Sequence, residues 1–342
     1  MKQERIQNPS LVERAAIEAK ISAGYHVILQ FDKPPYPPEL LQRINNLCGE
    51  YGKQLEVRFY GDYGTHFDAS ILCSLPDVAA LSIDCLSEVT NLTALSDLAN
   101  LRCLSLGIYR LGDQHILKSL QLHNLEKLVI GESLKANFNL APLQACGNLA
   151  ELYVVKHTKN IDSLAKLPAL RVLALHCIPK KQSIGFVSKI QSLRRLVVFL
   201  GGRANISEIQ HPKLEELEII RVMGFDNLDS LSAFPLLHTL RIEDQLRLES
   251  IRFSSSNKNI RSLMIFNCKK LGNLEGLDHL VELRKINIRM TVLDIDSILQ
   301  QKLPASLQMV SFSTGKQKEN DEIRKKLDSH GYRGWSRSDL GN

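Results

Sequence analysis

The sequence has few of the features that mark membrane, disulfide-rich or zinc-binding proteins. No apolar run approaches the ~20 residues needed to span a bilayer. The first 25 residues hold no uninterrupted apolar stretch that could form a signal-peptide core. The seven cysteines are scattered, odd in number and never spaced C-x-x-C. This cysteine usage indicates reduced thiols rather than a disulfide framework or a zinc site, so we expect a cytoplasmic protein.

The sequence also has a small net charge and lacks common catalytic motifs. The net charge is +6 over 342 residues, a mild excess that falls short of the concentrated basic surface typical of nucleic-acid-binding proteins. The sequence holds no glycine-rich phosphate loop, no H-E-x-x-H and no G-x-S-x-G. These absences disfavour an enzyme, and the sequence predicts no cofactor.

What the chain does contain is one phrase, repeated eleven times between Val78 and Phe312. The phrase is an apolar residue, two others, an apolar residue, one other and an apolar residue, as in VAALSI at 78–83 and LRCLSL at 101–106. Successive copies begin 21 to 24 residues apart. An L-x-x-L-x-L phrase with a period of about 20 to 29 residues is typical of the leucine-rich repeat. We therefore expect an α/β solenoid, a curved repeat array with a parallel sheet on its concave face.

The segments that follow the predicted strands have a second rhythm, apolar–x–x–Leu–x–x–apolar–x–x–Leu, which predicts short helical or 3₁₀ return segments. It occurs in LTALSDLANL (92–101), IDSLAKLPAL (161–170), LDSLSAFPLL (228–237) and LGNLEGLDHL (271–280). These stretches resemble the repeats of internalins and of a phosphatase regulatory subunit, over roughly residues 70–315. The resemblance implies a fold and no particular function. The position three residues after each phrase, often Asn or Cys in such repeats, matches only at Cys268, so we expect the asparagine ladder to be missing.

Both ends of the chain differ from the repeats, as the ends of a solenoid must. Residues 1–77 are expected to form a strand–helix–strand cap continuous with the solenoid, 78–315 the repeats, and 316–342 a C-terminal cap and tail. Ser10 with Glu13 predicts a capping box that opens a helix.

Within the N-terminal cap, YHVILQF (25–31) and QLEVRFY (54–60) alternate like strands, with a helix from Pro38 between them. In the C-terminal cap, Ile323 and Leu327 are expected to lie on the end of the sheet. Trp335, in the tail, is expected to anchor the cap, and an exposed peptide hook is the alternative.

The best candidate for chemistry is the loop GDYGTHFD at 61–68, where Asp62, His66 and Asp68 offer two carboxylates and an imidazole to a metal. The alternative, which we favour, is that Asp and Gly serve a turn. His157 and His176 are expected to be surface or strand-end residues rather than catalysts. Loop lysines form a solvated rim or, alternatively, a phosphate-binding stripe: Lys156, Lys159, Lys180, Lys181, Lys269 and Lys270.

Because side chains of a strand alternate between its two faces, the residues between the apolar positions of each phrase should line the concave face. Adjacent rows then predict an apolar patch made of Val129, Tyr153, Val155, Val172, Val197, Phe199 and Ile220. A charged zone runs beside it and contains Arg195, Glu216, Glu218, Arg241, Glu243, Lys285 and Arg289, and His176 lies at its margin. An apolar centre with a charged rim is typical of protein interfaces. Strand propensity alone is the alternative explanation for the valines.

The leading hypothesis is a non-catalytic protein–protein recognition scaffold that binds a partner on its concave face, such as an inhibitor, immunity or antitoxin protein. One alternative is a regulatory subunit of a cytosolic enzyme such as a phosphatase. Another is a weak nucleic-acid or phosphate binder that uses the loop lysines. A metal enzyme built on Asp62, His66 and Asp68 ranks below these.

Overall fold

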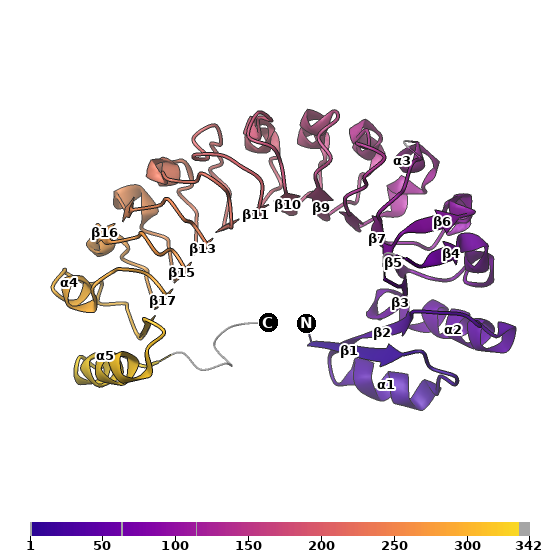
Figure 1. Cartoon of the computed structure of the whole chain (residues 1–342), viewed down its shortest axis with the longest axis horizontal. Helices are drawn as coiled ribbons and strands as arrows, with labels where there is room; N and C mark the ends of the chain where they lie inside the picture. Colours follow the sequence, from indigo (N-terminus) through magenta and orange to yellow (C-terminus); the bar gives the residue numbers. More distant parts are fainter. Residues whose placement is uncertain (1, 63, 114, 335–342) are drawn as a thin grey trace. The chain divides into compact units, whose positions relative to one another are not determined.

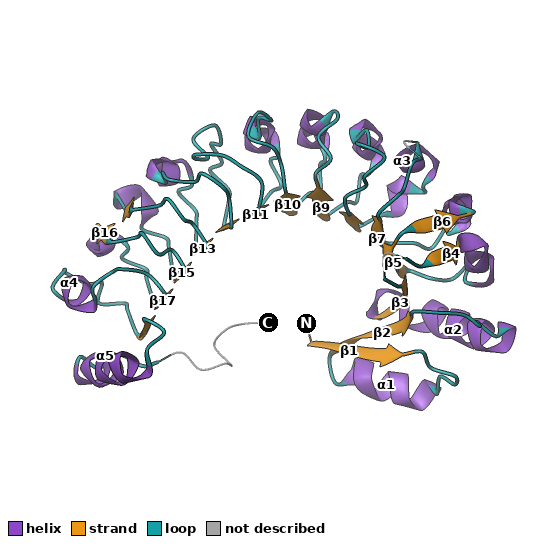
Figure 2. Ribbon diagram, in the orientation of Figure 1, coloured by secondary structure: helices purple, strands orange, loops and turns teal. Residues whose placement is uncertain are grey.

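The computed structural model describes residues 2–62, 64–113 and 115–334, and the chain divides into two compact units (Figure 1). Unit 1 runs to Leu170 and unit 2 begins at Arg171. In each unit the long strands line one side and the helical return segments lie on the opposite side (Figure 2). Each unit is therefore a stretch of the solenoid that the repeated phrase predicts.

Unit 1 is built on a parallel sheet whose described strands follow the order β1-β2-β3-β5-β7-β8-β9. These strands are β1 (Lys2–Gln7), β2 (Tyr25–Phe31), β3 (Leu55–Tyr60), β5 (Ala80–Leu86), β7 (Cys103–Ile108), β8 (Lys127–Ile130) and β9 (Glu151–Val155). A separate pair is formed by β4 (His66–Asp68) and β6 (Glu88–Thr90). The helices are α1 (Arg14–Ser22), α2 (Pro38–Tyr51) and α3 (Ile116–Ser119), and 3₁₀ turns include η1 (Gly52–Gln54), η3 (Leu92–Asp97) and η6 (Ile161–Lys166).

Unit 2 repeats the plan, with described strands in the parallel order β10-β11-β12-β13-β15-β17-β18. They are β10 (Val172–His176), β11 (Arg195–Phe199), β12 (Glu216–Ile220), β13 (Thr239–Glu243), β15 (Ser262–Phe266), β17 (Lys285–Arg289) and β18 (Met309–Ser313). Short strands β14 (Ser250–Arg252) and β16 (Asn273–Glu275) pair with each other. The helices are α4 (Ile295–Leu299) and α5 (Gln317–Ser329), and 3₁₀ turns include η8 (Asp229–Ala233) and η10 (Leu277–His279).

All eleven predicted repeat strands are present, and the apolar residues of the repeated phrase form the core. In β8, for example, Leu128 and Ile130 are buried while Lys127 and Val129 are half-exposed. The predicted return segments are also confirmed as 3₁₀ turns, except that the 271–280 segment begins with the short strand β16. The two-residue alternation therefore correctly separates core residues from concave-face residues.

No asparagine occupies the ladder position of the repeats, but other polar side chains form hydrogen bonds at this position in two of them. His157 is buried, accepts the Phe138 N–H at Nδ1 (3.1 Å) and thus donates from Nε2 to the Gly131 carbonyl (2.8 Å). In another repeat Gln245 donates to the Ile219 carbonyl (3.1 Å). A buried carbonyl without a partner is costly, so these side chains bond the turns of successive repeats together.

A second recurrent feature is a residue in the left-handed region, two positions after the last apolar residue of the repeated phrase. Its φ lies between 51° and 65° at Cys85, Lys156, Cys177, Leu200, Arg221, Asp244, Asn267 and Met290. Asn and Asp tolerate this conformation better than most residues. The other six positions carry residue types that do not favour the left-handed conformation, so this conformation could not be predicted from the sequence.

The strand, helix and strand predicted within residues 25–60 are present as β2, α2 and β3, and one strand that was not predicted precedes them. The extra strand, β1, pairs with β2 in parallel. Its sequence, KQERIQ, is too polar to stand out as a strand. The capping box is wrong, because the helix N-cap is Glu13 and it makes no side-chain capping bond.

The C-terminal helix α5 packs against β18, with Ile323 and Leu327 buried as predicted. Arg333 pairs with the outer edge of β18, where its carbonyl accepts the Val310 N–H (2.9 Å). Trp335 lies outside the described residues. The domain boundaries at 77/78 and 315/316 stay predictions.

Among the described residues, no helix combines the length and the apolar composition needed to cross a bilayer.

The buried imidazole of His157 predicts a pH-dependent stability. Burial lowers the pKa of His157 below its ordinary value, whereas in the unfolded chain the pKa is about 6.5. Protons therefore bind the unfolded chain preferentially, and stability falls as the pH drops below about 6.5. We expect His157→Gln, which copies the side chain at the equivalent position 245, to reduce the loss of stability between pH 7 and pH 5.

The measurement is the urea midpoint at both pH values. His157→Ala, which leaves the Phe138 N–H and the Gly131 carbonyl unpaired, should cost about 2–4 kcal/mol at pH 7. The exposed His123→Ala is the control and should change little. An identical pH dependence in the wild type and His157→Gln would contradict the structural role of the imidazole.

Candidate functional site

The concave face of unit 2 brings together ten of the predicted site residues, which we call the Phe199 surface: Val172, His176, Arg195, Val197, Phe199, Glu216, Glu218, Ile220, Arg241 and Glu243. The strand register places Phe199 between His176 and Ile220, and Val197 between Ala174 and Glu218. The predicted rows are thus real neighbours within this unit.

The apolar part of the Phe199 surface is centred on an aromatic pair. The rings of His176 and Phe199 meet edge to face with centroids 4.9 Å apart, a geometry that aromatic pairs prefer. Burial lowers the pKa of His176 below its ordinary value, which keeps the imidazole neutral near pH 7. Phe199, Ile220 and Val197 remain only partly exposed. The centre of the surface is therefore apolar and only partly exposed.

The charged part is one continuous network. Arg195 donates from Nε and Nη2 to the same Glu218 oxygen, at 3.1 and 2.5 Å, and lies 3.4 Å from Glu216. Arg241 lies 3.7 Å from Glu218 and 2.5 Å from Glu243. Only 11% of the Glu218 side chain is exposed, so its charge is held between two guanidinium groups. Such pairing fixes the side chains in one arrangement before any partner arrives.

The network continues to an aromatic residue that the predicted set omitted. Arg241 and Arg289 both lie over the Phe266 ring, at 5.6 and 5.7 Å from its centroid. Asn287 is completely buried and accepts a 3.0 Å bond from Arg289 Nε, while its own Nδ2 has no partner among the described residues. Both omitted residues lie at concave positions of the alternation, so the sequence carried the signal.

Three predicted residues, Val129, Tyr153 and Val155, belong to unit 1 and are described separately from the Phe199 surface. Val129 and Tyr153 are register partners on β8 and β9. The Lys127 ammonium lies over the Tyr153 ring at 5.5 Å and forms a 3.2 Å ion pair with Glu151. The predicted single patch is thus divided between the two units.

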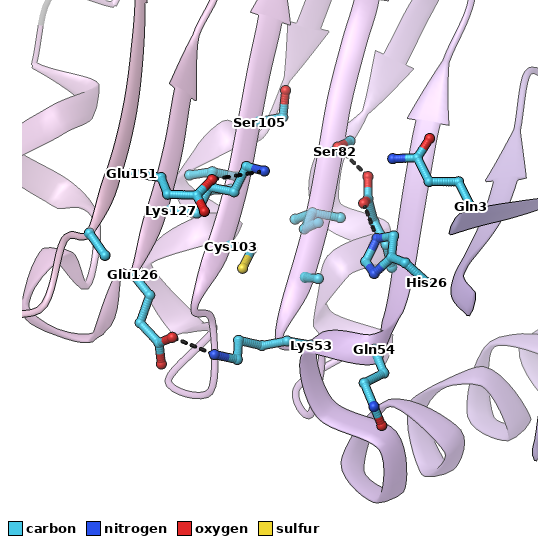
Figure 3. A pocket seen from close by; sticks show the side chains of 15 residues that line it. Gln3, His26, Lys53, Gln54, Ser82, Cys103, Ser105, Glu126, Lys127 and Glu151 are labelled. Carbon is cyan, nitrogen blue, oxygen red and sulfur yellow. Dashed lines mark hydrogen bonds and ion pairs between the residues drawn. The ribbon is translucent and has the colours of Figure 1, made fainter. Parts of the chain in front are cut away.

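Unit 1 also contains a hollow of about 520 Å³ on its concave face, here called the β5–β7 hollow (Figure 3). It exists because β5 and β7 present small side chains, Ala80 and Cys103 among them, to this face. Longer side chains surround them: His26, Lys53, Glu56, Glu126, Lys127 and Glu151. The alternation predicts these small residues at concave positions, and the hollow that they leave was not among the predicted sites.

The loop at 61–68 serves a turn. Asp62 Oδ1 accepts the Gly64 N–H and the Thr65 hydroxyl, both at 3.0 Å, and Asp68 Oδ1 accepts the Ser70 N–H at 2.9 Å. His66 is exposed. In the part of the chain that the structure describes, no three His, Cys, Asp or Glu side chains are grouped to hold a metal.

The loop lysines are dispersed on the surface. Lys156 lies 2.5 Å from Glu132. The other loop lysines, Lys159, Lys180, Lys181, Lys269 and Lys270, are exposed. The lysine pairs at 180–181 and 269–270 belong to different repeats of unit 2.

The thiol of Cys103, which lines the hollow, should react slowly. Burial, the largest cause, raises the pKa of Cys103 to about 11. Since the thiolate is the reactive form, we expect iodoacetamide to alkylate Cys103 about 100-fold more slowly at pH 8 than an ordinary thiol with a pKa near 8.5. The rate should still rise about tenfold per unit between pH 8 and pH 10. Quantitative mass spectrometry, with the exposed Cys73 as internal reference, measures both rates. A plateau for Cys103 near pH 9 would contradict its desolvation.

Comparison with known proteins supports the fold. A scan of protein-family models finds no match, and a sequence comparison with curated proteins finds none either. Among solved structures, an internalin of Listeria monocytogenes superposes with a TM-score of 0.54 and 17% identity, over 85% of this chain and 80% of that one. A leucine-rich repeat protein of Leptospira interrogans gives a TM-score of 0.45 at 14% identity, over 91% and 89% of the two chains. The first likeness, together with the eleven repeat strands and their buried apolar letters, shows that the chain has the leucine-rich-repeat fold and that its repeats resemble those of internalins.

Proposed function

We propose that the protein is a non-catalytic recognition scaffold whose protein partner binds the Phe199 surface. The observation that carries the proposal is the organisation of this surface, in which an apolar centre around Phe199 is bordered by the ion-paired network of Arg195, Glu218 and Arg241. A few residues supply most of the binding energy in protein interfaces, and arginine is enriched among them. Phenylalanine is enriched at interfaces relative to the rest of the surface.

Preorganisation supports the proposal. Each arginine of the network is held by at least one carboxylate, and Phe199 is held against His176. Side chains that are already ordered lose little conformational freedom on binding, which saves about 0.5–1.5 kcal/mol for each long side chain. Parallel strands also keep the backbone rigid, and solenoid proteins use such concave surfaces for binding.

A cytoplasmic location forms part of the proposal. All seven cysteines, which lie within the described residues, are free thiols. Unpaired cysteines are typical of a reducing compartment. In such a compartment the scaffold would serve as an inhibitor, immunity or antitoxin protein, or as a regulatory subunit. The identity of the partner distinguishes these roles.

The test is a comparison of variants in partner capture. Phe199→Asp places an unpaired charge at the apolar centre, and we expect it to reduce capture of a stoichiometric partner from native lysate at least tenfold. Val281→Asp is the matched control, because Val281 is an exposed apolar residue of the same unit outside the concave face. Quantitative mass spectrometry of the bound fraction measures the effect. Equal capture by both variants, or no stoichiometric partner for the wild type near physiological salt, would count against the proposal.

A further inference from the structure

The β5–β7 hollow of unit 1 has the size and lining of a ligand site. Pockets that bind ligands have volumes of about 300–1,000 Å³ and combine an apolar lining with a few placed polar groups. Ala80 and Cys103 line the hollow, and Figure 3 shows Cys103 and Ser105 on the same strand, β7. Side chains from β2, β3, β8 and β9 form its walls. The hollow lies within unit 1 and shares no residue with the Phe199 surface.

The charged side chains in the walls already have partners, and this pairing determines the charge of the ligand that the hollow can bind. Glu56 accepts hydrogen bonds on both oxygens, from His26 Nε2 (2.8 Å) and from Ser82 Oγ (2.6 Å). Burial alone would raise the pKa of Glu56, but these bonds and the charges of His26 and Arg58 lower it overall, so the carboxylate stays ionised.

The other two carboxylates of the hollow are ion-paired. Glu126 binds Lys53, and Glu151 binds Lys127 at 3.2 Å. An ionic ligand would have to break one of these pairs and leave its partner unmatched. An uncharged group enters without that loss, so charge complementarity favours a neutral occupant.

The groups that remain available suit an aromatic ring. Cys103 lines the hollow, and a free cysteine packs as a small apolar side chain. The ammonium groups of Lys53 and Lys127 also line the hollow; both are ion-paired, and Lys127 lies over the face of Tyr153 while it keeps its ion pair with Glu151. A ring in the hollow would meet the same cation–π attraction. The Ser105 hydroxyl and the Gln3 and Gln54 amides offer hydrogen-bonding partners to a phenol or an indole.

We propose that the β5–β7 hollow is a side-chain pocket that takes one tyrosine or tryptophan from a protein partner. The assignment of the aromatic group to a protein partner rests on the proposed function. The preference of the pocket for an aromatic ring does not depend on it. The hollow would then anchor a segment of the partner at a second site, apart from the Phe199 surface.

The experiment measures the binding of small probes to the hollow and needs no protein partner. A negative result is therefore distinguishable from a failure of partner capture. The full chain is labelled with ¹³C at alanine methyl groups, and Ala80, which lines the hollow, reports binding. We expect N-acetyl-tryptophanamide and N-acetyl-tyrosinamide to shift the Ala80 resonance with saturation at about 0.1–10 mM. N-acetyl-leucinamide should bind at least fivefold more weakly. Free indole and phenol are included, and tighter binding of these than of the blocked residues would overturn the assignment to a protein side chain.

Two variants connect the signal to the hollow. Cys103→Phe fills part of the hollow and should weaken binding at least tenfold, while Ser262→Phe, which enlarges a small concave residue of unit 2, should not affect it. Lys127→Met keeps the side-chain length but removes the ammonium, and should weaken binding about two- to fivefold. If Cys103→Phe fails to fold, the Lys127→Met variant tests whether binding occurs in the hollow.

Three further results would overturn the inference. The first is the absence of a saturable shift of Ala80 up to the solubility of both aromatic probes. The second is equal binding of the leucine derivative, and the third is tighter binding of the N-acetyl amides of glutamate or lysine.

Discussion

The structure depends on the inability of one repeat to bury its own apolar face. A phrase of six residues offers three apolar side chains, and they leave water only when the next repeat stacks on them. In unit 1, Leu104, Leu128 and Leu152 occupy equivalent positions on successive strands and are all buried. Burial is worth about 0.8 kcal/mol for each methylene. This requirement fixes the parallel register, and the register in turn fixes which side chains share the concave face.

The concave face is consequently the part of the chain that is free to vary. Its residues do not fill the core, so each unit can use them differently. Unit 2 places an ion-paired network beside Phe199, whereas unit 1 places small side chains on β5 and β7 and leaves a hollow. The two surfaces therefore differ in chemistry although the backbone plan beneath them is the same.

Much of this follows from sequence, because two simple periods suffice. The repeat period gives the strands, and the two-residue alternation gives the face on which Phe199 and Arg241 lie. Other features require knowledge of neighbouring side chains. Glu218 is largely covered because two arginines reach it, and Lys53 binds Glu126 across 73 residues of sequence. The strand β1 escaped prediction because its sequence is polar.

The most direct test of the central claim is hydroxyl-radical footprinting of the protein with and without its captured partner. Phenylalanine, histidine and methionine side chains report their own exposure, and the Phe199 surface contains His176 and Phe199 on adjacent strands. We expect the partner to protect both residues. Protection confined to Met223 and other exposed side chains outside the concave face, with His176 and Phe199 unchanged, would contradict the account.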